Sequence, residues 1–410
     1  MANSLVTIDM ITREALRVAH ETSQFIATTD RQYDDSYGKT GAKIGSTLRV
    51  RKPNQYTRTQ GSRVMDVQEQ DERSSAIILA TQDHVDMRFN SAELALTIDE
   101  ISKRYIEPAV KTLISGVESD YIAASTKATY NLAGTFGTPP VDLVAVGAAR
   151  AKLNQGLAPK DGNRNIQMDS VTMGGLVNGL KGLFQDSAQI KEQYREGMIG
   201  RSAMADWYEN DRMYSQAYGN DVTGTTDAAA LVTDGALATT NGLTVDMHTT
   251  VAVADQRVGM VFTIAGVYAC HPETKAPYSS LQQFTITAIG TSTTTIAPQI
   301  FLTGPRKNVV SVTGATLLTT DFNSKALAFF GAVNTSYVQN LMYHKEAFQF
   351  VTADLPLMDS AEKCVRRVQD GLSLRVWQDS DIRNDELLMR IDILYGFAAL
   401  RPEWACRITS

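Results

Sequence analysis

The residue types that most often carry catalysis or metal binding are few in this chain and lie far apart. The sequence holds three cysteines, Cys270, Cys364 and Cys406, and five histidines. Only Cys270 and His271 are adjacent, and neighbours on a strand point to opposite faces. Metal sites need closer and repeated ligand spacings. We therefore expect structural roles for these residues, with no catalytic residue, metal or cofactor, and the sparse cysteines are typical of a reducing compartment.

Three further segments approach chemical motifs without completing them. Gly38–Thr40 matches the end of a phosphate-binding loop, but Tyr33 stands where the leading glycine belongs. The glycines between residues 174 and 182 are not in GxGxxG spacing, which favours close helix packing or a loop. The carboxylates between Asp379 and Glu386 lack the spacing of a calcium loop, which favours a solvated turn.

One charged feature calls for a partner, a basic stretch between residues 36 and 65. It contains seven basic residues and no acid: Lys39, Lys43, Arg49, Arg51, Lys52, Arg58 and Arg63. Two interleaved tyrosines are too few for a single-stranded nucleic-acid platform. Acids follow directly, at Asp66, Glu69, Asp71 and Glu72. We interpret both groups as contacts between identical subunits, in which Arg49, Arg51, Lys52, Arg58 and Arg63 meet the acids of a neighbour, with a solvated loop as the alternative.

The elements that must position this stretch begin with an amphipathic arm over residues 1–30, where Ile11, Ala15 and Val18 recur at helical spacing. Thr47–Arg51 alternates like a strand, and Ile77–Met87 supplies a returning strand. Together they predict a long two-stranded projection. Because an isolated ribbon is marginally stable in water, it should lie on something else.

The strongest helix signal follows. Thr97 and Glu100 have capping-box spacing, and one apolar stripe continues through Tyr121. Pro108 falls inside this helix and should kink it. A second helix is expected over Val141–Leu153, whereas Met173–Phe184 is rich in glycine and ambiguous.

Composition changes sharply over residues 223–320, which hold 22 threonines and nine charged residues. We expect an inserted sandwich or barrel built from strands at Val251–Val253, Gly259–Tyr268, Leu281–Ile289, Thr293–Ile300 and Val309–Val312. A helical return is expected over Ser324–Ala332 and Ser336–Lys345. Strands are expected again at Leu372–Gln378 and Leu387–Ala398.

Length and charge narrow the class of protein. At 410 residues the chain is long enough for two or three cores, and its net charge of −6 argues against a protein whose main task is to coat nucleic acid. Its apolar stretches are too short to span a bilayer, and the first residues do not resemble a secretion signal. We expect no membrane partner and synthesis in the cytoplasm.

Several segments, in the same order along the chain, resemble the P-22-like podovirus coat proteins. They are Ser46–Val50 leading into Gln55–Gly61, Tyr194–Gly197 with Ile199 and Arg201, Gly259–Val267, Val333–Ser336, Leu394–Gly396 and Leu400–Glu403. Tyr194–Gly197 with Ile199 and Arg201 resembles that family's YRDG-x-I-x-R, and the last two segments resemble its WYG and TRPE. The inserted segment departs from the family because it is poor in charged residues. In that family a charged loop of the inserted domain makes contacts between capsomers. Here the residues that could form such a loop are Arg306 and Lys307, with Asp246, Asp255 and Glu273 as their possible partners.

The resemblance implies an α+β chain with the HK-97-like capsid fold of tailed phages. The parts would be an N-terminal arm (1–30), an extended β-loop with peripheral strands (31–88), a spine helix (89–131), the first part of an axial and peripheral α/β domain (132–221), an inserted β-domain (222–334) and the return of the host domain (335–410).

The resemblance also implies function and partners. The chain would be a major capsid protein that builds an icosahedral shell of hexamers and pentamers around double-stranded DNA, which it encloses without specific binding. A scaffolding protein, met by Asp9 and Glu14 of the arm, would direct a precursor shell with a portal at one vertex, assembled in the host cytoplasm. The alternatives are an enzyme, an encapsulin-like cellular compartment, and a tail or receptor-binding protein.

Overall fold

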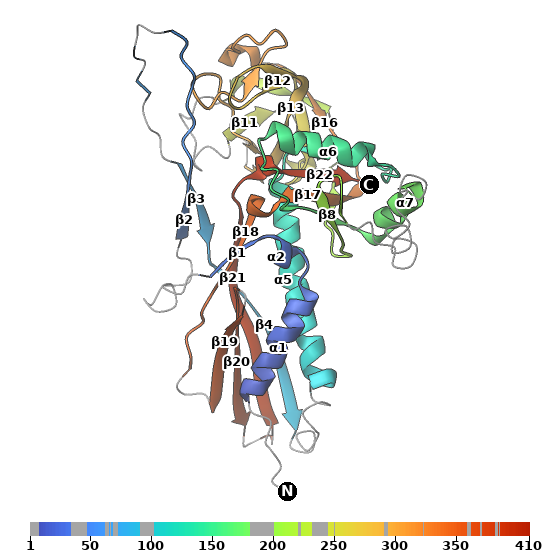
Figure 1. Cartoon of the computed structure of the whole chain (residues 1–410), viewed down its shortest axis with the longest axis vertical. Helices are drawn as coiled ribbons and strands as arrows, with labels where there is room; N and C mark the ends of the chain where they lie inside the picture. Colours follow the sequence, from blue (N-terminus) through green and yellow to red (C-terminus); the bar gives the residue numbers. More distant parts are fainter. Residues whose placement is uncertain are drawn as a thin grey trace. The chain divides into compact units, whose positions relative to one another are not determined.

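A computed structural model gives the fold of the chain (Figure 1). It describes residues 8–33, 47–61, 65, 67–68, 73–90, 102–180, 201–219, 223–231, 245–249, 251–290, 294–322, 324–358, 362–369, 371–381, 384 and 386–410. The chain divides into two compact units. The first comprises residues 1–49, 76–122 and 348–398, and the second residues 50–75, 123–347 and 399–410.

The first unit is built on a six-stranded sheet. The strands are β1 (Asp30–Tyr33), β4 (Thr81–Asn90), β18 (Phe348–Ala353), β19 (Lys363–Gln369), β20 (Leu372–Asp381) and β21 (Glu386–Ala399), in the order β1-β18-β21-β20-β19 with β4 also paired to β21. The two late strands predicted from the sequence are thereby confirmed as β20 and β21. Helix α1 (Ile8–Thr22) packs on β19 and β20.

The predicted arm helix is confirmed, and it is firmly packed within its unit. Ile11, Ala15 and Val18, which define its apolar stripe, are all buried. The following short helix α2 (Phe25–Thr28) is held by Glu118 of the spine helix, whose carboxylate accepts hydrogen bonds from the backbone N–H groups of Gln24 and Phe25. The Glu118 carboxylate thus satisfies backbone N–H groups at the start of α2 that have no partner within the helix.

The spine helix α5 (Glu107–Ala128) begins later than the sequence predicted. A π-helical turn, η2 (Ser102–Ile106), precedes it, and the predicted cap at Thr97 and Glu100 lies outside the described residues. Pro108 is therefore the second residue of the α-helix, where its missing N–H breaks no helical hydrogen bond. The chain changes from π- to α-helical bonding directly before this proline, and the kink expected at Pro108 stays a prediction.

The second unit holds a seven-stranded mixed sheet. Its strands are β5 (Leu132–Ala133), β6 (Arg164–Met168), β7 (Arg201–Ser202), β8 (Ala205–Glu209), β9 (Ser215–Ala217), β17 (Ser336–His344) and β22 (Ala405–Thr409). The helical return predicted over Ser324–Ala332 and Ser336–Lys345 is wrong, because these residues form strands β16 (Ala326–Phe329) and β17. Strand β17 lies between β6 and β22 and is buried on both faces from Gln339 to His344, so its apolar and polar residues do not alternate.

Two helices accompany this sheet. Helix α6 (Leu143–Gln155) confirms the predicted one, and the carboxylate of Asp142 caps it by accepting from the backbone N–H of Val144 at 2.9 Å. The ambiguous glycine-rich segment forms α7 (Ser170–Leu180). A Cβ on Gly179 would lie 1.8 Å from the carbonyl oxygen of Val141, so close backbone packing explains this glycine.

The threonine-rich insertion forms a closed antiparallel barrel. Strands β10 (Thr223–Leu231), β11 (Val245–Thr249), β12 (Val261–Cys270), β13 (Pro277–Ile289), β14 (Thr294–Ala297) and β16 pair in the ring β13-β14-β11-β10-β16-β12-β13, and β15 (Val309–Val310) adds to β12. Phe262, Phe284 and Leu327 lie in its core. The strand predicted at Val251–Val253 is wrong, since a 3₁₀ turn, η3 (Val253–Asp255), begins there.

The projection, called the ribbon below, consists of strands β2 (Thr47–Lys52) and β3 (Arg73–Ile78), which pair only with each other, and of the described residues between them. The returning strand predicted at Ile77–Met87 needs correction, because the chain leaves β3 at Ile78 and enters β4 at Thr81. Strand β4 pairs with β21 over its whole length and so belongs to the sheet of the first unit.

Candidate functional site: the charged ribbon, the arm helix and the barrel junction

The ribbon presents part of the predicted cationic set to solvent. Arg49, Arg51 and Arg58 are exposed and Lys52 is half-buried. Arg49 and Arg51 are two residues apart on β2, so they lie on the same face of the strand. The other predicted contacts, Arg63, Asp66, Glu69, Asp71 and Glu72, fall outside the described residues.

The ribbon also exposes apolar side chains that the sequence reasoning did not single out. Tyr56 is 56% exposed, Met65 88% and Val67 75%. Near them, the side-chain amide of Gln68 takes the place of a strand partner: its Oε1 accepts from the backbone N–H of Thr57 at 2.8 Å, and its Nε2 donates to the Thr57 carbonyl at 2.5 Å. The ribbon thus combines positive charge with apolar groups, the composition of a contact surface.

The arm places its predicted acids differently. Asp9 belongs to α1, but its side chain is not among those described. The Glu14 carboxylate pairs with the Arg17 guanidinium at 2.5 Å, and Arg17 also pairs with Glu21 at 2.5 Å. Glu14 is therefore part of a charge network on the helix surface, with i,i+3 and i,i+4 spacing.

The junction between the inserted barrel and its host depends on Arg407, which the sequence reasoning missed. This side chain is fully buried on β22. Its Nε donates to the Thr129 carbonyl at 2.7 Å, and its Nη1 to the Gly259 carbonyl at 2.6 Å. Its Nη2 bonds to the Lys127 carbonyl and to the Thr285 hydroxyl, at 3.2 and 3.0 Å. One cation thus joins the end of the spine helix, the barrel and the sheet of the second unit.

The acceptors of Arg407 are all neutral, so burial dominates its electrostatics and lowers its pKa to about 10. A second connection between the barrel and the host sheet lies beside Arg407. The Gln283 amide of β13 accepts from the Leu132 N–H at 2.9 Å and donates to the Leu132 carbonyl at 3.1 Å. The barrel is therefore fixed to its host through buried, directional hydrogen bonds.

The described residues contain no group of three or more His, Cys, Asp or Glu side chains that would hold a metal ion. The three cysteines are free. Of the carboxylates considered for calcium, Glu386 pairs with Arg88 at 3.1 Å. Within the same residues, no helix has the length and apolar character to cross a membrane.

Together, these elements follow the order that the HK-97-like fold of phage capsids predicts: an arm, a β projection, a spine helix, a mixed sheet and a late β insertion. The sequence matches the P22 coat protein family (gene protein 5) over residues 77–407. The chain belongs to this family of coat proteins. It is a major capsid protein, which forms the shell of the virion.

Distant structural likenesses accompany this match. The chain aligns with a protein of Mycobacterium phage Che8 at 10% identity and a TM-score of 0.47, covering 94% of this chain and 90% of the other. It aligns with the capsid of Ralstonia phage GP4 at 8% identity and a TM-score of 0.44, covering 93% of this chain and 85% of the other. It aligns with the acid-stable capsid of Helicobacter pylori bacteriophage KHP30 at 12% identity and a TM-score of 0.42, covering 95% of this chain and 91% of the other. No curated protein matches the sequence significantly.

Proposed function

We propose that the ribbon carries the subunit contact of the shell, by lying on a neighbouring copy within hexamers and pentamers. The exposed set of Tyr56, Met65, Val67 and the ribbon arginines supports this best. A two-stranded ribbon with apolar groups in water gains stability when a second surface covers them. The acids of the neighbouring subunit, among them Asp66, Glu69, Asp71 and Glu72, are the proposed partners of its cations.

Charge complementarity in this proposal selects geometry more than it adds affinity. An exposed ion pair contributes about 0.2–1 kcal/mol, so three pairs contribute roughly 1–3 kcal/mol per subunit. Apolar burial over many modest interfaces supplies the remainder. The protein acts without catalysis, and it encloses double-stranded DNA without specific contacts, in keeping with its net charge of −6.

We further propose that a scaffolding protein directs a precursor shell in the host cytoplasm, with a portal at one vertex, and that Asp9 and Glu14 meet a basic scaffold segment. Glu14 already shares a guanidinium with Glu21, so a scaffold cation would join an existing network. Reversing both charges to lysine should reduce the scaffold content of precursor shells. Unchanged content on gels of purified shells would contradict this contact.

The ribbon is tested by replacing Arg49, Arg51 and Arg58 with alanine. Assembly with scaffolding protein, followed by light scattering, should slow severalfold at low salt and lose most of its salt dependence, because the steering charges are gone. The matched control removes three exposed cations elsewhere, Arg104, Lys160 and Lys345, each to alanine, and should assemble like the parent chain. Equal rates and equal salt slopes for the two triple variants would refute the pairing.

A further inference from the structure

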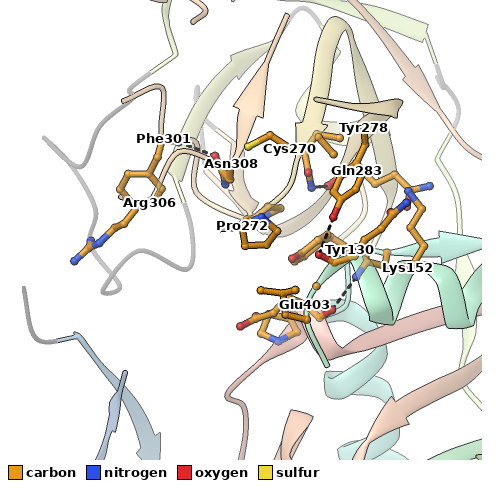
Figure 2. Close-up of a pocket in the computed structure, with 18 of the residues that line it drawn as sticks. Tyr130, Lys152, Cys270, Pro272, Tyr278, Gln283, Phe301, Arg306, Asn308 and Glu403 are labelled. Atoms are coloured by element: carbon orange, nitrogen blue, oxygen red, sulfur yellow. Dashed lines mark hydrogen bonds between the residues drawn. The ribbon is translucent and has the colours of Figure 1, made fainter. Parts of the chain in front are cut away.

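The second unit contains a pocket of about 320 Å³ where the inserted barrel meets its host (Figure 2). Pro272 and Tyr278 of the barrel line it on one side, and Lys152 of α6 and Glu403 on the other. Small-molecule sites span about 300–1,000 Å³, and this pocket lies at the lower end of that range. It therefore has room for one compact ligand and not for a folded partner.

Positive charge dominates the lining of this pocket. A single carboxylate, that of Glu403, lines it together with six cationic side chains, Lys52, Lys152, Lys275, Arg306, Lys307 and Arg401. All six are half-buried. Arg306 and Lys152 stand on opposite sides of the lining, as Figure 2 shows. The positive charge is thus spread along the pocket, an arrangement that favours an anion with more than one charged group.

The ammonium groups of Lys152 and Lys307 are only partly engaged by the protein. The Nζ of Lys152 lies 3.5 Å from the Ser280 hydroxyl. The Nζ of Lys307 donates to the Thr316 hydroxyl at 3.0 Å. Both partners are neutral, and an ammonium group has three N–H donors, so most of these donors remain open. Burial lowers the pKa of Lys152, as expected for an ammonium group that has lost water without gaining an anion.

Arg401 also keeps open donors, whereas Lys275 does not. The Arg401 guanidinium lies 4.1 Å from the centroid of the Trp404 ring, and its N–H groups have no hydrogen-bond acceptor among the described residues. The ring covers one face of the guanidinium, but the N–H groups lie in its plane and can bind an oxyanion from the edge. The Nζ of Lys275 donates to three backbone carbonyls, so it contributes charge to the pocket without an open donor.

We propose that this pocket binds a small polyvalent oxyanion, a compact molecule with two or more phosphate or carboxylate groups. Lys152 and Arg401 supply donors from the host, and Lys307 supplies them from the barrel. A monovalent anion leaves the positive charge on the far side of the lining uncompensated, and a DNA duplex is too large to enter. The inference does not depend on the subunit contact proposed above, because the pocket lies within one chain.

Calorimetric titration of the full-length unassembled chain tests the proposal. The probes are inorganic tripolyphosphate, citrate, acetate, a DNA duplex and an oligoglutamate peptide. Tripolyphosphate or citrate should bind one to one, at least about tenfold more tightly than acetate, and with an affinity that falls as salt is added. Tighter binding of tripolyphosphate assigns the site to polyphosphates, tighter binding of citrate assigns it to polycarboxylates, and equal affinities mean that charge alone is recognised.

Variants connect binding to the named groups. Lys152→Met and Arg401→Met each remove one cation and keep much of its aliphatic volume, so each should weaken binding at least about tenfold, because hydrogen bonds to charged groups are strong. The exposed control Lys345→Met, which lies outside the pocket, should leave the affinity unchanged. Glu403→Gln removes the opposing carboxylate and should tighten binding severalfold, a gain that a misfolded variant cannot imitate.

Four results would each overturn the proposal. They are binding of tripolyphosphate and citrate no tighter than that of acetate, tighter binding of the duplex or the peptide than of both small anions, full affinity in both methionine variants, and an unchanged affinity in Glu403→Gln.

Discussion

Replacing Arg407 with methionine probes how the inserted barrel is held to its host. Methionine keeps much of the buried aliphatic volume but removes all four hydrogen bonds. The carbonyl oxygens of Thr129 and Gly259 lose this donor, whereas the Lys127 carbonyl and the Thr285 hydroxyl keep the hydrogen bond that joins them at 3.1 Å.

Two opposing contributions set the size of the effect. Each buried acceptor left unpaired costs about 1–3 kcal/mol, so the carbonyls of Thr129 and Gly259 give roughly 2–6 kcal/mol before the site relaxes. Methionine also abolishes the cost of burying a cation. The pKa is lowered from 12.5 to about 10, which corresponds to about 3 kcal/mol at neutral pH. Because the lost hydrogen bonds outweigh the buried charge over the upper half of that range, we expect a net loss of about 1–3 kcal/mol.

Urea unfolding followed by tryptophan fluorescence measures this loss. Trp207 and Trp404 lie in the same unit as Arg407, and Trp377 lies in the other unit, so a Trp377→Phe background reports on the affected unit alone. The exposed control Lys345→Met should change the midpoint little. If Arg407→Met is as stable as the parent, the desolvation cost outweighs the hydrogen bonds, and the assignment of Arg407 as the tie is refuted.

Two further predictions concern buried or perturbed charges. Arg375 and Asp392 form a buried pair, with Nε to Oδ1 at 3.0 Å. The protein should lose about 3–5 kcal/mol of stability when Asp392 alone becomes asparagine, and less when both residues become apolar, and thermal unfolding of these two variants beside the parent chain would show the difference. Desolvation raises the pKa of Asp161, but hydrogen bonds from Asn163 and His344 outweigh it and hold this pKa at about 2. Because this lies below the ordinary value of 3.8, the stabilisation is complete above pH 4 and is lost as the pH falls towards 2. Asp161→Asn should flatten that part of the stability curve in acid-unfolding experiments, and an unchanged slope would contradict the assignment.

The sequence predicted the elements whose signals are local. The arm helix followed from the 3.6-residue recurrence of Ile11, Ala15 and Val18, all of which are buried. Helix α6 and strands β12, β13, β20 and β21 followed from periodicity and β-branched composition. The close packing that the sequence favoured for the glycine-rich segment is confirmed at Gly179, which lies against the backbone of Val141.

The errors lie where tertiary context overrides local pattern. Ser336–His344 was assigned to a helix because a strand buried on both faces shows no alternation. The boundary between β3 and β4 was missed because their two pairings, one in the ribbon and one with β21, continue a single β-rich run. Arg407 could not be found from sequence, since all its hydrogen-bond partners lie more than one hundred residues away along the chain.

Closure of the inserted barrel has a consequence for crowding. Among the described residues, its ring of six strands leaves no long unpaired backbone edge, so two barrels brought together at high local concentration find no template for strand addition along these strands. Neighbouring copies must therefore recognise one another through side chains there, and changes in the barrel's loops can accumulate without opening a route to fibrous polymerisation.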